Sequence, residues 1–271
     1  MPELPEVETT RQGIAPHITG QRIRQVVIRQ PRLRWPIPDD LPQLLKGRKL
    51  LSVGRRGKYL LLTFHHGTLI LHLGMSGSLR IVEADARAQK HDHFELRLGD
   101  DRRLRLRDPR RFGAVLWTEQ PISQHPLLAG LGPEPLSEAF DGAYLHGQGK
   151  HRRIPVKQLI MESKTVVGVG NIYANESLFR AAIHPTRPSN RISAVRYQTL
   201  ADEIRKVLVE AISQGGTTLR DFLRQDGRPG YFAQKLLVYG KAEEPCPECG
   251  TAIRSKSLAQ RSTFFCPRCQ H

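Results

Sequence analysis

The sequence predicts an α+β protein built from a β-rich domain, a helical domain and a small metal-binding module, in that order. Three observations carry this prediction. Residues 23–117 contain many short runs of aliphatic and β-branched residues between turn signals, which is typical of a β-sandwich or a barrel. Residues 138–213 show helical periodicity instead. All four cysteines fall within the last 26 residues.

The N-terminal part is expected to contain one helix followed by strands. Apolar residues recur at helical intervals over residues 3–18, and Pro16 and Gly20 close that pattern. Hairpin turns are expected at residues 65–67 and 99–101. The expected strands are residues 23–29, 49–53, 59–64, 68–73, 78–82, 93–98, 103–107 and 114–117.

The C-terminal half is expected to be helical up to the cysteine module. Helices are predicted over residues 138–145, 153–162, 171–181 and 193–213, the last with an apolar stripe of Val195, Leu200, Ile204, Leu208 and Ile212. Residues 217–232 combine Gly and Pro with polar residues and are expected to form a mobile loop. The predicted domains are residues 1–118, a linker at 119–137, residues 138–232 and residues 233–271.

Charge restricts the class of partner. Lys and Arg total 42 against 26 Asp and Glu, which gives a formal net charge of +16 and a pI near 10.2. Such an excess indicates a polyanion partner, and nucleic acid is favoured over membrane because no run of 18 apolar residues occurs. The N-terminus lacks the pattern of a secretory signal, so a cytoplasmic protein is expected.

The cysteines form the most specific motif in the chain. Cys246 and Cys249 are followed, after sixteen residues, by Cys266 and Cys269. Two pairs at this spacing supply four thiolates for tetrahedral zinc, and a site closed by four protein ligands predicts one structural Zn²⁺. The alternative is a set of buried thiols without metal. Arg261 lies between the pairs, where a β-hairpin could carry it into a groove.

The first nine residues, MPELPEVET, allow two interpretations. In the first they simply begin a helix, with acidic residues in its first turn. In the second, removal of Met1 makes Pro2 the chain terminus, and its secondary amine titrates near pH 8. Such an amine attacks aldehyde-like carbon and forms an iminium. Glu3 and Glu6 would then lie on one helix face beside it.

Other motifs are weaker on their own. Gly168–Asn171 precedes a helix, with Asn171 as the expected N-cap, so it could hold phosphate or simply form a tight turn. Arg55–Lys58 is a basic turn whose Lys58 could bind phosphate. Lys150–Arg153 is more typical of a solvated face. Met75, Arg110 and Phe112 offer side chains that wedge between bases, although packing explains each alone.

Taken together and in order, these motifs resemble the bacterial formamidopyrimidine-DNA glycosylases. The resemblance rests on MPELPEVET, on RGKYL at 56–60, HLGMSG at 72–77 and DPRRFG at 108–113, on VVGVGNIYANESLF at 166–179 and on the cysteine pairs. It implies an N-terminal β-sandwich, a helix–two-turn–helix domain and a zinc finger. It also implies a repair enzyme that flips oxidised purines out of duplex DNA, removes them and cleaves the strand by β,δ-elimination.

The resemblance implies roles for particular residues. Pro2 would be the nucleophile and Glu3 the acid, Glu6 would support the site, Lys58 would hold the phosphate beside the lesion, and Arg261 would assist the second elimination. Further DNA contacts are implied at His91, Arg110, Arg153, Lys157, Asn171, Met75 and Phe112. The segment 217–231 would close on the damaged base.

Two competing functions remain open from the sequence. The related endonuclease VIII type prefers oxidised pyrimidines, and the Leu4-Pro5 start with the Met75, Arg110 and Phe112 set favours the purine enzyme. A non-catalytic zinc-finger DNA-binding protein would explain the charge and the cysteines, but it leaves Pro2 and Glu3 without a role. The expected partner is damaged double-stranded DNA bound by a monomer, with no membrane and no nucleotide cofactor.

Overall fold

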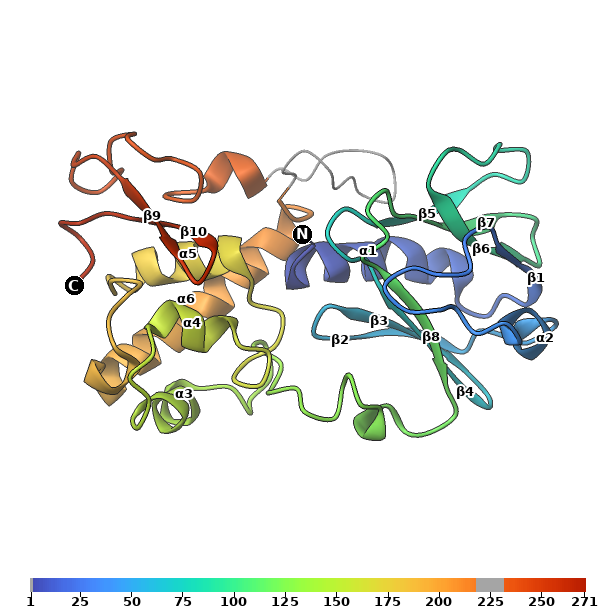
Figure 1. Ribbon diagram of the computed structural model, residues 1–271, viewed down its shortest axis with the longest axis horizontal. Helices are drawn as coiled ribbons and strands as arrows, with labels where there is room; N and C mark the ends of the chain where they lie inside the picture. Colours follow the sequence, from blue (N-terminus) through green and yellow to red (C-terminus); the bar gives the residue numbers. More distant parts are fainter. Residues whose placement is uncertain (1, 218–231) are drawn as a thin grey trace. The chain divides into compact units, whose positions relative to one another are not determined.

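The computed structural model describes residues 2–217 and 232–271, which form two compact units (Figure 1). The first unit comprises the chain up to Ala129 together with the segment that starts at Gln214, and the second comprises residues 130–213 and 232–271. The break at 129–130 falls inside the segment predicted as a linker. The expected lesion loop, residues 217–231, lies outside the described residues except for Thr217. Among the helices described, none has the length and apolarity to cross a bilayer.

The first unit is a sandwich of two antiparallel four-stranded sheets that share one core. One sheet has the order β1 (Ile23–Ile28), β6 (Asp92–Leu98), β7 (Arg103–Arg107) and β5 (Ser78–Val82). The other has the order β2 (Ser52–Arg56), β3 (Tyr59–Phe64), β4 (Gly67–His72) and β8 (Ala114–Thr118). Leucines and other aliphatic residues from both sheets are buried between them, which confirms the predicted β-domain.

Helix α1 (Leu4–Ile18) packs against this sandwich. Its buried face consists of Leu4, Val7, Ile14 and Ile18, each at most 1% exposed. Pro5 falls in the first turn, where a missing N–H costs nothing. Apolar burial on one face therefore fixes the position of the helix start, which carries Pro2 and Glu3.

Two elements of the first unit differ from prediction. The strand expected at 49–53 is instead β2 at Ser52–Arg56, because the pairing with β3 runs from Ser52 opposite Thr63 to Arg56 opposite Tyr59, and Leu51 stays 44% exposed. The short helix α2 (Leu41–Leu45) was not predicted, although Pro42 in its first turn is a helix-start signal. The β3–β4 and β6–β7 hairpins turn where predicted.

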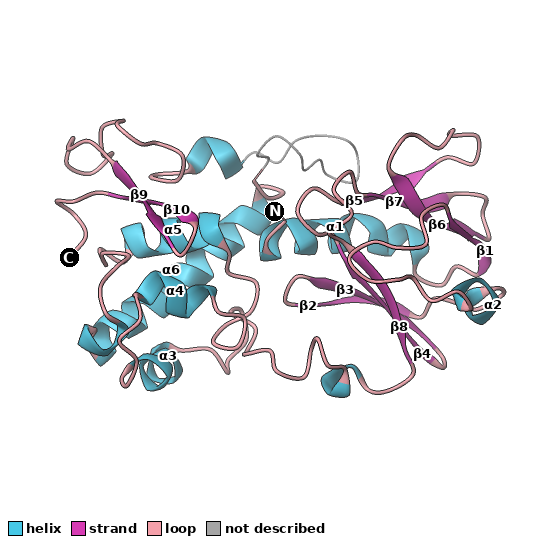
Figure 2. Cartoon of the chain, in the orientation of Figure 1, coloured by secondary structure: helices cyan, strands magenta, loops and turns pink. Residues whose placement is uncertain are grey.

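The second unit is helical, as predicted (Figure 2). Its core surrounds the long helix α6, whose Leu200, Ile204 and Leu208 are fully buried. Val195 was expected on the same stripe but is 76% exposed, because it lies in the first, solvent-facing turn. The helices are α3 (Gly142–Gly149), α4 (Val156–Met161), α5 (Asn171–Arg180) and α6 (Ala194–Ser213), with short 3₁₀ turns at Ser189–Arg191 and Phe232–Lys235. A further 3₁₀ turn, Ile122–Gln124, belongs to the first unit.

Helix α3 starts four residues later than predicted because Asp141 caps it. The Asp141 carboxylate accepts the Tyr144 N–H at 2.7 Å, as an N-cap does. The cysteine module ends the unit with the hairpin of β9 (Arg254–Leu258) and β10 (Arg261–Phe265), which carries Arg261 as expected. Its core residues Ile253 and Cys266 pack with Phe179 of α5.

Candidate functional site

The start of α1 is a buried, acidic site. Pro2 is buried, and Glu3 and Glu6 are 3% and 2% exposed. One Glu6 carboxylate oxygen accepts the Glu3 N–H at 2.8 Å, and the other accepts the Thr217 N–H at 2.8 Å. Because a buried carboxylate needs such partners, Glu6 is tied to the backbone both at Glu3 and at Thr217, which lies 211 residues further along the chain than Glu6. Glu6 thus positions the chain around Pro2 and Glu3.

A glycine at position 216 is required for the backbone at Thr217 to lie this close to Glu6. Its φ is +82°, a left-handed conformation that favours glycine, and a Cβ at this position would lie 3.0 Å from Glu6 Oε1. The segment that leads into residues 218–231 is therefore anchored on α1 by Glu6. The only signal in the sequence is the Gly215-Gly216 pair, which directly follows the predicted helix 193–213.

Helix α1 is joined to the turn that carries Lys58 through Glu8. The Glu8 carboxylate accepts hydrogen bonds from Arg11 at 2.7 Å and from Arg55 at 3.0 Å. Although burial opposes ionisation, these two guanidinium groups lower the pKa of Glu8. Arg55 also donates to the Gly57 carbonyl at 2.9 Å, directly before Lys58. Sequence reasoning treated Arg55 as a generic basic turn and missed this network.

His72 lies between Lys58 and the Met75 turn and is largely buried. Its Nδ1 accepts the Gly74 N–H at 3.0 Å, and its ring centroid is 4.9 Å from that of Tyr59. Burial, with the charges of Lys58 and Arg34, lowers the pKa of His72 to about 4. His72 is therefore neutral at pH 7 and can accept the hydrogen bond that shapes the turn. The sequence marked this histidine only as part of HLGMSG.

The lowered pKa predicts acid sensitivity. An unfolded histidine titrates near pH 6.5, so the unfolded chain binds more protons than the native chain as pH falls from 6.5 to about 4. Native stability attributable to His72 is present above pH 6.5 and is lost on acidification through this window, by up to about 3 kcal/mol. Urea unfolding of His72→Asn, which keeps an acceptor but does not titrate, should show a smaller loss between pH 7 and pH 5. An identical loss would contradict the assignment.

Met75, Arg110 and Phe112 come from two adjoining loops of the first unit. Met75 is 38% and Phe112 44% exposed, and the Arg110 guanidinium lies 4.9 Å from the Phe112 ring centroid. Gly74 has a φ of +64°, and a Cβ there would lie 2.5 Å from the Phe112 carbonyl carbon. The loops border a cavity of about 630 Å³ lined by Arg32, Leu33, Arg34, His72, Gly74, Met75, Arg111 and Phe112.

Buried hydrogen bonds hold the loop that presents Arg110. Asp108 is completely buried, and its carboxylate accepts the Gly113 N–H at 2.7 Å. The Asp108 N–H donates to the His91 carbonyl at 3.0 Å. His91 itself has a φ of +75°, a conformation that costs energy for a non-glycine residue and concentrates at functional sites. His91 and Arg110 are thus fixed to one scaffold residue.

In the second unit, three residues predicted to contact DNA meet at the β9–β10 hairpin of the cysteine module. The Asn171 amide donates to the Ser262 carbonyl at 3.0 Å. The Lys157 ammonium donates to the same carbonyl at 3.0 Å and to the Thr263 hydroxyl at 2.7 Å. Arg261, the first residue of β10, is exposed beside them. The second unit therefore presents Arg261 and Asn171 together.

Two sequence interpretations change here. Asn171 is not the N-cap of α5: Gly170 occupies that position, and Asn171 is the first helical residue, with its side chain on the hairpin. Lys157 is only 1% exposed and braces the hairpin from inside. Arg153 is exposed in the segment before α4.

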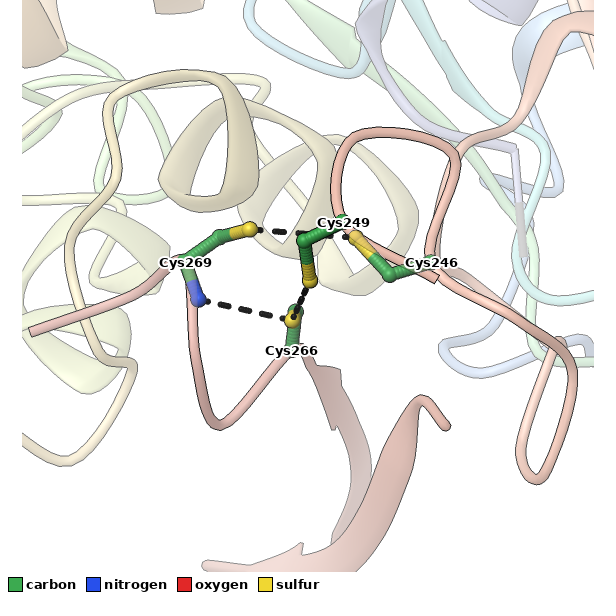
Figure 3. Close-up of side chains that lie close together, drawn as sticks. All are labelled: Cys246, Cys249, Cys266 and Cys269. Atoms are coloured by element: carbon green, nitrogen blue, oxygen red, sulfur yellow. Dashed lines mark hydrogen bonds between the residues drawn. The ribbon is translucent and has the colours of Figure 1, made fainter. Parts of the chain in front are cut away.

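The four cysteines form a closed metal site (Figure 3). Their sulfur atoms all lie within 4.8 Å of one another, with 3.9 Å between Cys246 and Cys269 and 3.5 Å between Cys249 and Cys266. Tetrahedral Zn²⁺ with Zn–S bonds of about 2.3 Å requires sulfur separations of about 3.8 Å. Gly250 makes the tight turn after a ligand at φ +74°. The geometry therefore fits one structural zinc ion.

The charge of the four cysteine thiolates also favours a bound cation. Hydrogen bonds to Thr251 lower the pKa of Cys249 to about 6, whereas the crowding of Cys269 against Cys249 raises the pKa of its thiol. Four neighbouring thiolates repel one another unless a metal ion compensates their charge. The zinc ion supplies that charge, and the cysteines hold the Arg261 hairpin.

The predicted site residues are thus divided between the two units. Pro2, Glu3, Glu6, Lys58, Met75, His91, Arg110 and Phe112 belong to the first unit. Arg153, Lys157, Asn171, Arg261 and the cysteines belong to the second. Sequence reasoning missed Glu176, a fully buried carboxylate that accepts the N–H groups of Leu237, Val238 and Tyr239 at 2.8–3.0 Å.

Three family models match most of the chain. They are the formamidopyrimidine-DNA glycosylase N-terminal domain at residues 1–115, the formamidopyrimidine-DNA glycosylase H2TH domain at residues 131–223, and the zinc finger found in FPG and IleRS at residues 243–271. These ranges follow the predicted order of β-domain, helix–two-turn–helix domain and zinc finger.

Curated and solved relatives cover the whole chain. The formamidopyrimidine-DNA glycosylases of Methylococcus capsulatus and Vibrio cholerae are 60% and 55% identical, each with full coverage of both chains. MutM (FPG) from Thermus thermophilus has a TM-score of 0.89 at 41% identity, covering 99% of this chain and 98% of its own. A point mutant of Lactococcus lactis FPG, solved with Fapy-dG-containing DNA, has a TM-score of 0.92 at 35% identity and full coverage of both chains. The chain therefore belongs to the formamidopyrimidine-DNA glycosylase family.

Proposed function

We propose that this protein is a bifunctional DNA glycosylase and AP lyase that removes oxidised purines from duplex DNA in base excision repair. Its substrates are 8-oxoguanine opposite cytosine and formamidopyrimidines. The observation that carries the proposal is the buried Pro2–Glu3 start of α1, which Glu6 holds from two sides. Solved relatives bound to Fapy-dG-containing DNA and to carbocyclic 8-oxo-G-containing DNA support the substrate class.

The chemistry starts from the Pro2 nitrogen after removal of Met1. This secondary amine attacks the anomeric carbon, the glycosidic bond breaks, and the base leaves with its electron pair. The Pro2 nitrogen gives up its proton to the departing base, Glu3 protonates the ring oxygen, and cleavage of the bond between that oxygen and the anomeric carbon opens the sugar and leaves an iminium linked to Pro2. The iminium acidifies the neighbouring C–H, and loss of that proton expels one phosphate and then, after a further proton loss, the other. Glu6 takes no proton in this scheme because backbone N–H groups occupy both of its oxygens.

The nucleotide must leave the stack before Pro2 can reach it. Unstacking costs a few kcal/mol, and apolar wedges with phosphate contacts offset that cost. Met75 and Phe112 are exposed apolar side chains on braced loops and would fill the vacated space, while Arg110 would contact the opposite cytosine. The segment 217–231, which lies outside the described residues apart from Thr217, would close on the flipped base.

Cationic and polar groups from both units would hold the backbone. Lys58 would bind the phosphate beside the lesion, and Asn171 and Arg261 would bind another, with Arg261 assisting the second elimination. His91 and Arg153 would add contacts, and Lys157 would act through the hairpin that it braces. The protein would work as a monomer in the cytoplasm and would need no nucleotide cofactor.

Base release from defined duplexes tests this function. The protein should release 8-oxoguanine opposite cytosine in preference to an oxidised pyrimidine, and Glu3→Gln should slow release by about 10²–10⁴-fold, the usual contribution of a positioned acid. Glu83→Gln, on the same unit and away from the start of α1, serves as the matched control. Preference for the oxidised pyrimidine would favour the endonuclease VIII type, and no release of either base would contradict the proposal.

Arg110→Ala should narrow the preference for cytosine over adenine opposite the lesion. A good arginine–base contact contributes about 1–3 kcal/mol of discrimination, so the ratio of excision rates should fall by about 5- to 150-fold. Arg111→Ala, one residue further along the same loop, is the matched control. An unchanged opposite-base ratio in Arg110→Ala would count against this role.

A further inference from the structure

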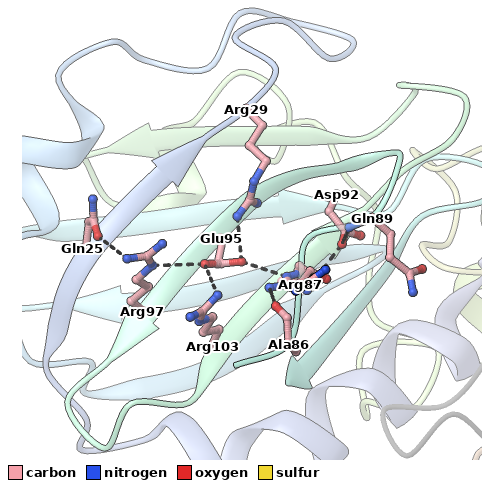
Figure 4. A network of polar contacts seen from close by, with 10 residues as sticks. Gln25, Arg29, Ala86, Arg87, Gln89, Asp92, Glu95, Arg97 and Arg103 are labelled. Carbon is pink, nitrogen blue, oxygen red and sulfur yellow. Dashed lines mark hydrogen bonds and ion pairs between the residues drawn. The ribbon is translucent and has the colours of Figure 1, made fainter. Parts of the chain in front are cut away.

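The outer face of the β1–β6–β7–β5 sheet carries a dense group of arginines (Figure 4). Strand β7 alternates strictly: Leu104 and Leu106 are fully buried in the core, while Arg103, Arg105 and Arg107 point to the opposite face. None of these arginines belongs to the site described above.

Glu95 neutralises only the centre of this face. Its completely buried carboxylate contacts Arg105 at 2.8 Å, Arg29 at 3.1 Å, Arg97 at 3.3 Å and Arg103 at 3.7 Å. Burial opposes ionisation, but hydrogen bonds from Arg105 and Arg29 lower the pKa of Glu95. A single carboxylate cannot balance four guanidinium groups, so positive charge remains on the face.

Arg80 on β5 adds a further positive charge, which the Asp92 carboxylate offsets only in part. It is paired in register with Arg105, and like charges directly opposite each other destabilise a sheet. Its Nε is buried and has no hydrogen-bond partner among the described residues. Burial and the neighbouring charge of Arg107 lower the pKa of Arg80. A buried donor without a partner normally indicates that a ligand or water completes the site.

A small pocket of about 170 Å³ is lined by four arginines, Arg80, Arg87, Arg105 and Arg107. The loop after β5 covers it, since Arg105 donates to the Ala86 and Arg87 carbonyls at 2.8 and 3.1 Å. The facing charges are the guanidinium groups of Arg80, Arg87, Arg105 and Arg107 and one carboxylate, Asp92. The Asp92 carboxylate already has partners of its own, because it accepts the Gln89 N–H at 2.7 Å and lies 3.5 Å from the Arg105 guanidinium.

We propose that this pocket binds a phosphate group and that its source is a backbone phosphodiester of DNA beyond the lesion contacts. Fork-shaped guanidinium groups match the oxygen geometry of phosphate. The DNA assignment rests on the proposed function and on chain connectivity: Ser78 follows Met75 by three residues, and Arg107 precedes Arg110 by three. A chain spans at most about 3.6 Å per residue. Ser78 and Arg107, which line the pocket, therefore lie within about 11 Å of the backbones of Met75 and Arg110.

The experiment compares Arg80→Gln and Arg107→Gln with Arg24→Gln, a matched control on β1 of the same sheet, outside the pocket. Binding to an undamaged duplex is measured over a salt series, and melting temperature is measured with and without inorganic phosphate. Each pocket variant should weaken duplex binding and reduce the slope of log K against log salt by about 0.9, the effect of one lost phosphate contact. In the absence of phosphate, the melting temperature of Arg80→Gln should equal or exceed that of the parent, because the substitution removes the repulsion between Arg80 and Arg105.

These measurements distinguish a DNA phosphate from free inorganic phosphate, and they distinguish failure of the pocket proposal from failure of the proposed function. Loss of phosphate-induced stabilisation with unchanged duplex binding supports the phosphate site but assigns it to free phosphate rather than DNA. Unchanged salt slope together with unchanged phosphate stabilisation overturns the proposal. Single-turnover base release by the control Arg24→Gln should equal that of the parent, because Arg24 lies outside both the pocket and the start of α1. Failure of the parent to release any base would instead count against the proposed function alone.

Discussion

A chain that keeps one residue ahead of Pro2 is expected to lose base release and strand cleavage while it still binds damaged duplex DNA. An amide nitrogen has no lone pair available for attack, so the nucleophile disappears although every other contact of Glu3 and Glu6 can persist. Removal of a covalent nucleophile costs about 10³-fold or more in rate. The measurement is strand cleavage of an 8-oxoguanine duplex under single-turnover conditions, with binding measured in parallel.

The matched control for this experiment is the same extended protein after proteolytic removal of the extra residue. Cleavage should return with the free Pro2 amine, because nothing else in the chain has changed. Full lyase activity in the extended chain would overturn the assignment of Pro2. Loss of DNA binding in the extended chain would show that the helix start has a structural role instead.

Cys249→Ser should lose zinc and weaken DNA binding by about 100-fold or more, with the first unit still folded. Structural zinc contributes about 10–16 kcal/mol in isolated zinc-finger peptides, far more than the small contacts of a hairpin. Without zinc, the hairpin keeps its hydrogen bonds from Asn171 and Lys157 and its small core with Phe179, but it loses the tie between the two cysteine pairs. Arg261 would then lose its fixed position.

Zinc content by mass spectrometry, duplex affinity and near-ultraviolet circular dichroism together test this prediction. Ser255→Ala, at an exposed position of the same hairpin, should keep its zinc and its affinity. Normal affinity in zinc-free Cys249→Ser would refute a role of the finger in DNA binding.

Local patterns were sufficient to predict most of this fold. Alternation in β7 and the turn at residues 65–67 act over a few residues, so strand positions follow from the sequence. The cysteine spacing likewise predicts its own site, because ligand chemistry restricts the alternatives. By contrast, the start of α3 depends on a cap at Asp141, and a single competing polar residue is enough to move a helix boundary.

The contacts that position the candidate site could not be predicted from the sequence, because they join distant residues. Glu6 meets Thr217 across 211 positions, and Arg55 meets Glu8 across 47. The family resemblance implied a DNA contact at Lys157, but its side chain is buried because it bonds to a hairpin more than 100 residues away. Such pairs become visible only when the folded chain brings them together.

Borohydride trapping is the most direct test of the central claim, that the Pro2 nitrogen forms a covalent iminium with the sugar. The purified chain, with its N-terminus established by intact mass, is incubated with an 8-oxoguanine duplex and reductant, digested and sequenced by mass spectrometry. The account predicts one stable adduct, located on Pro2. Absence of any adduct from a chain that begins at Pro2, or an adduct located on a lysine such as Lys58, would contradict it.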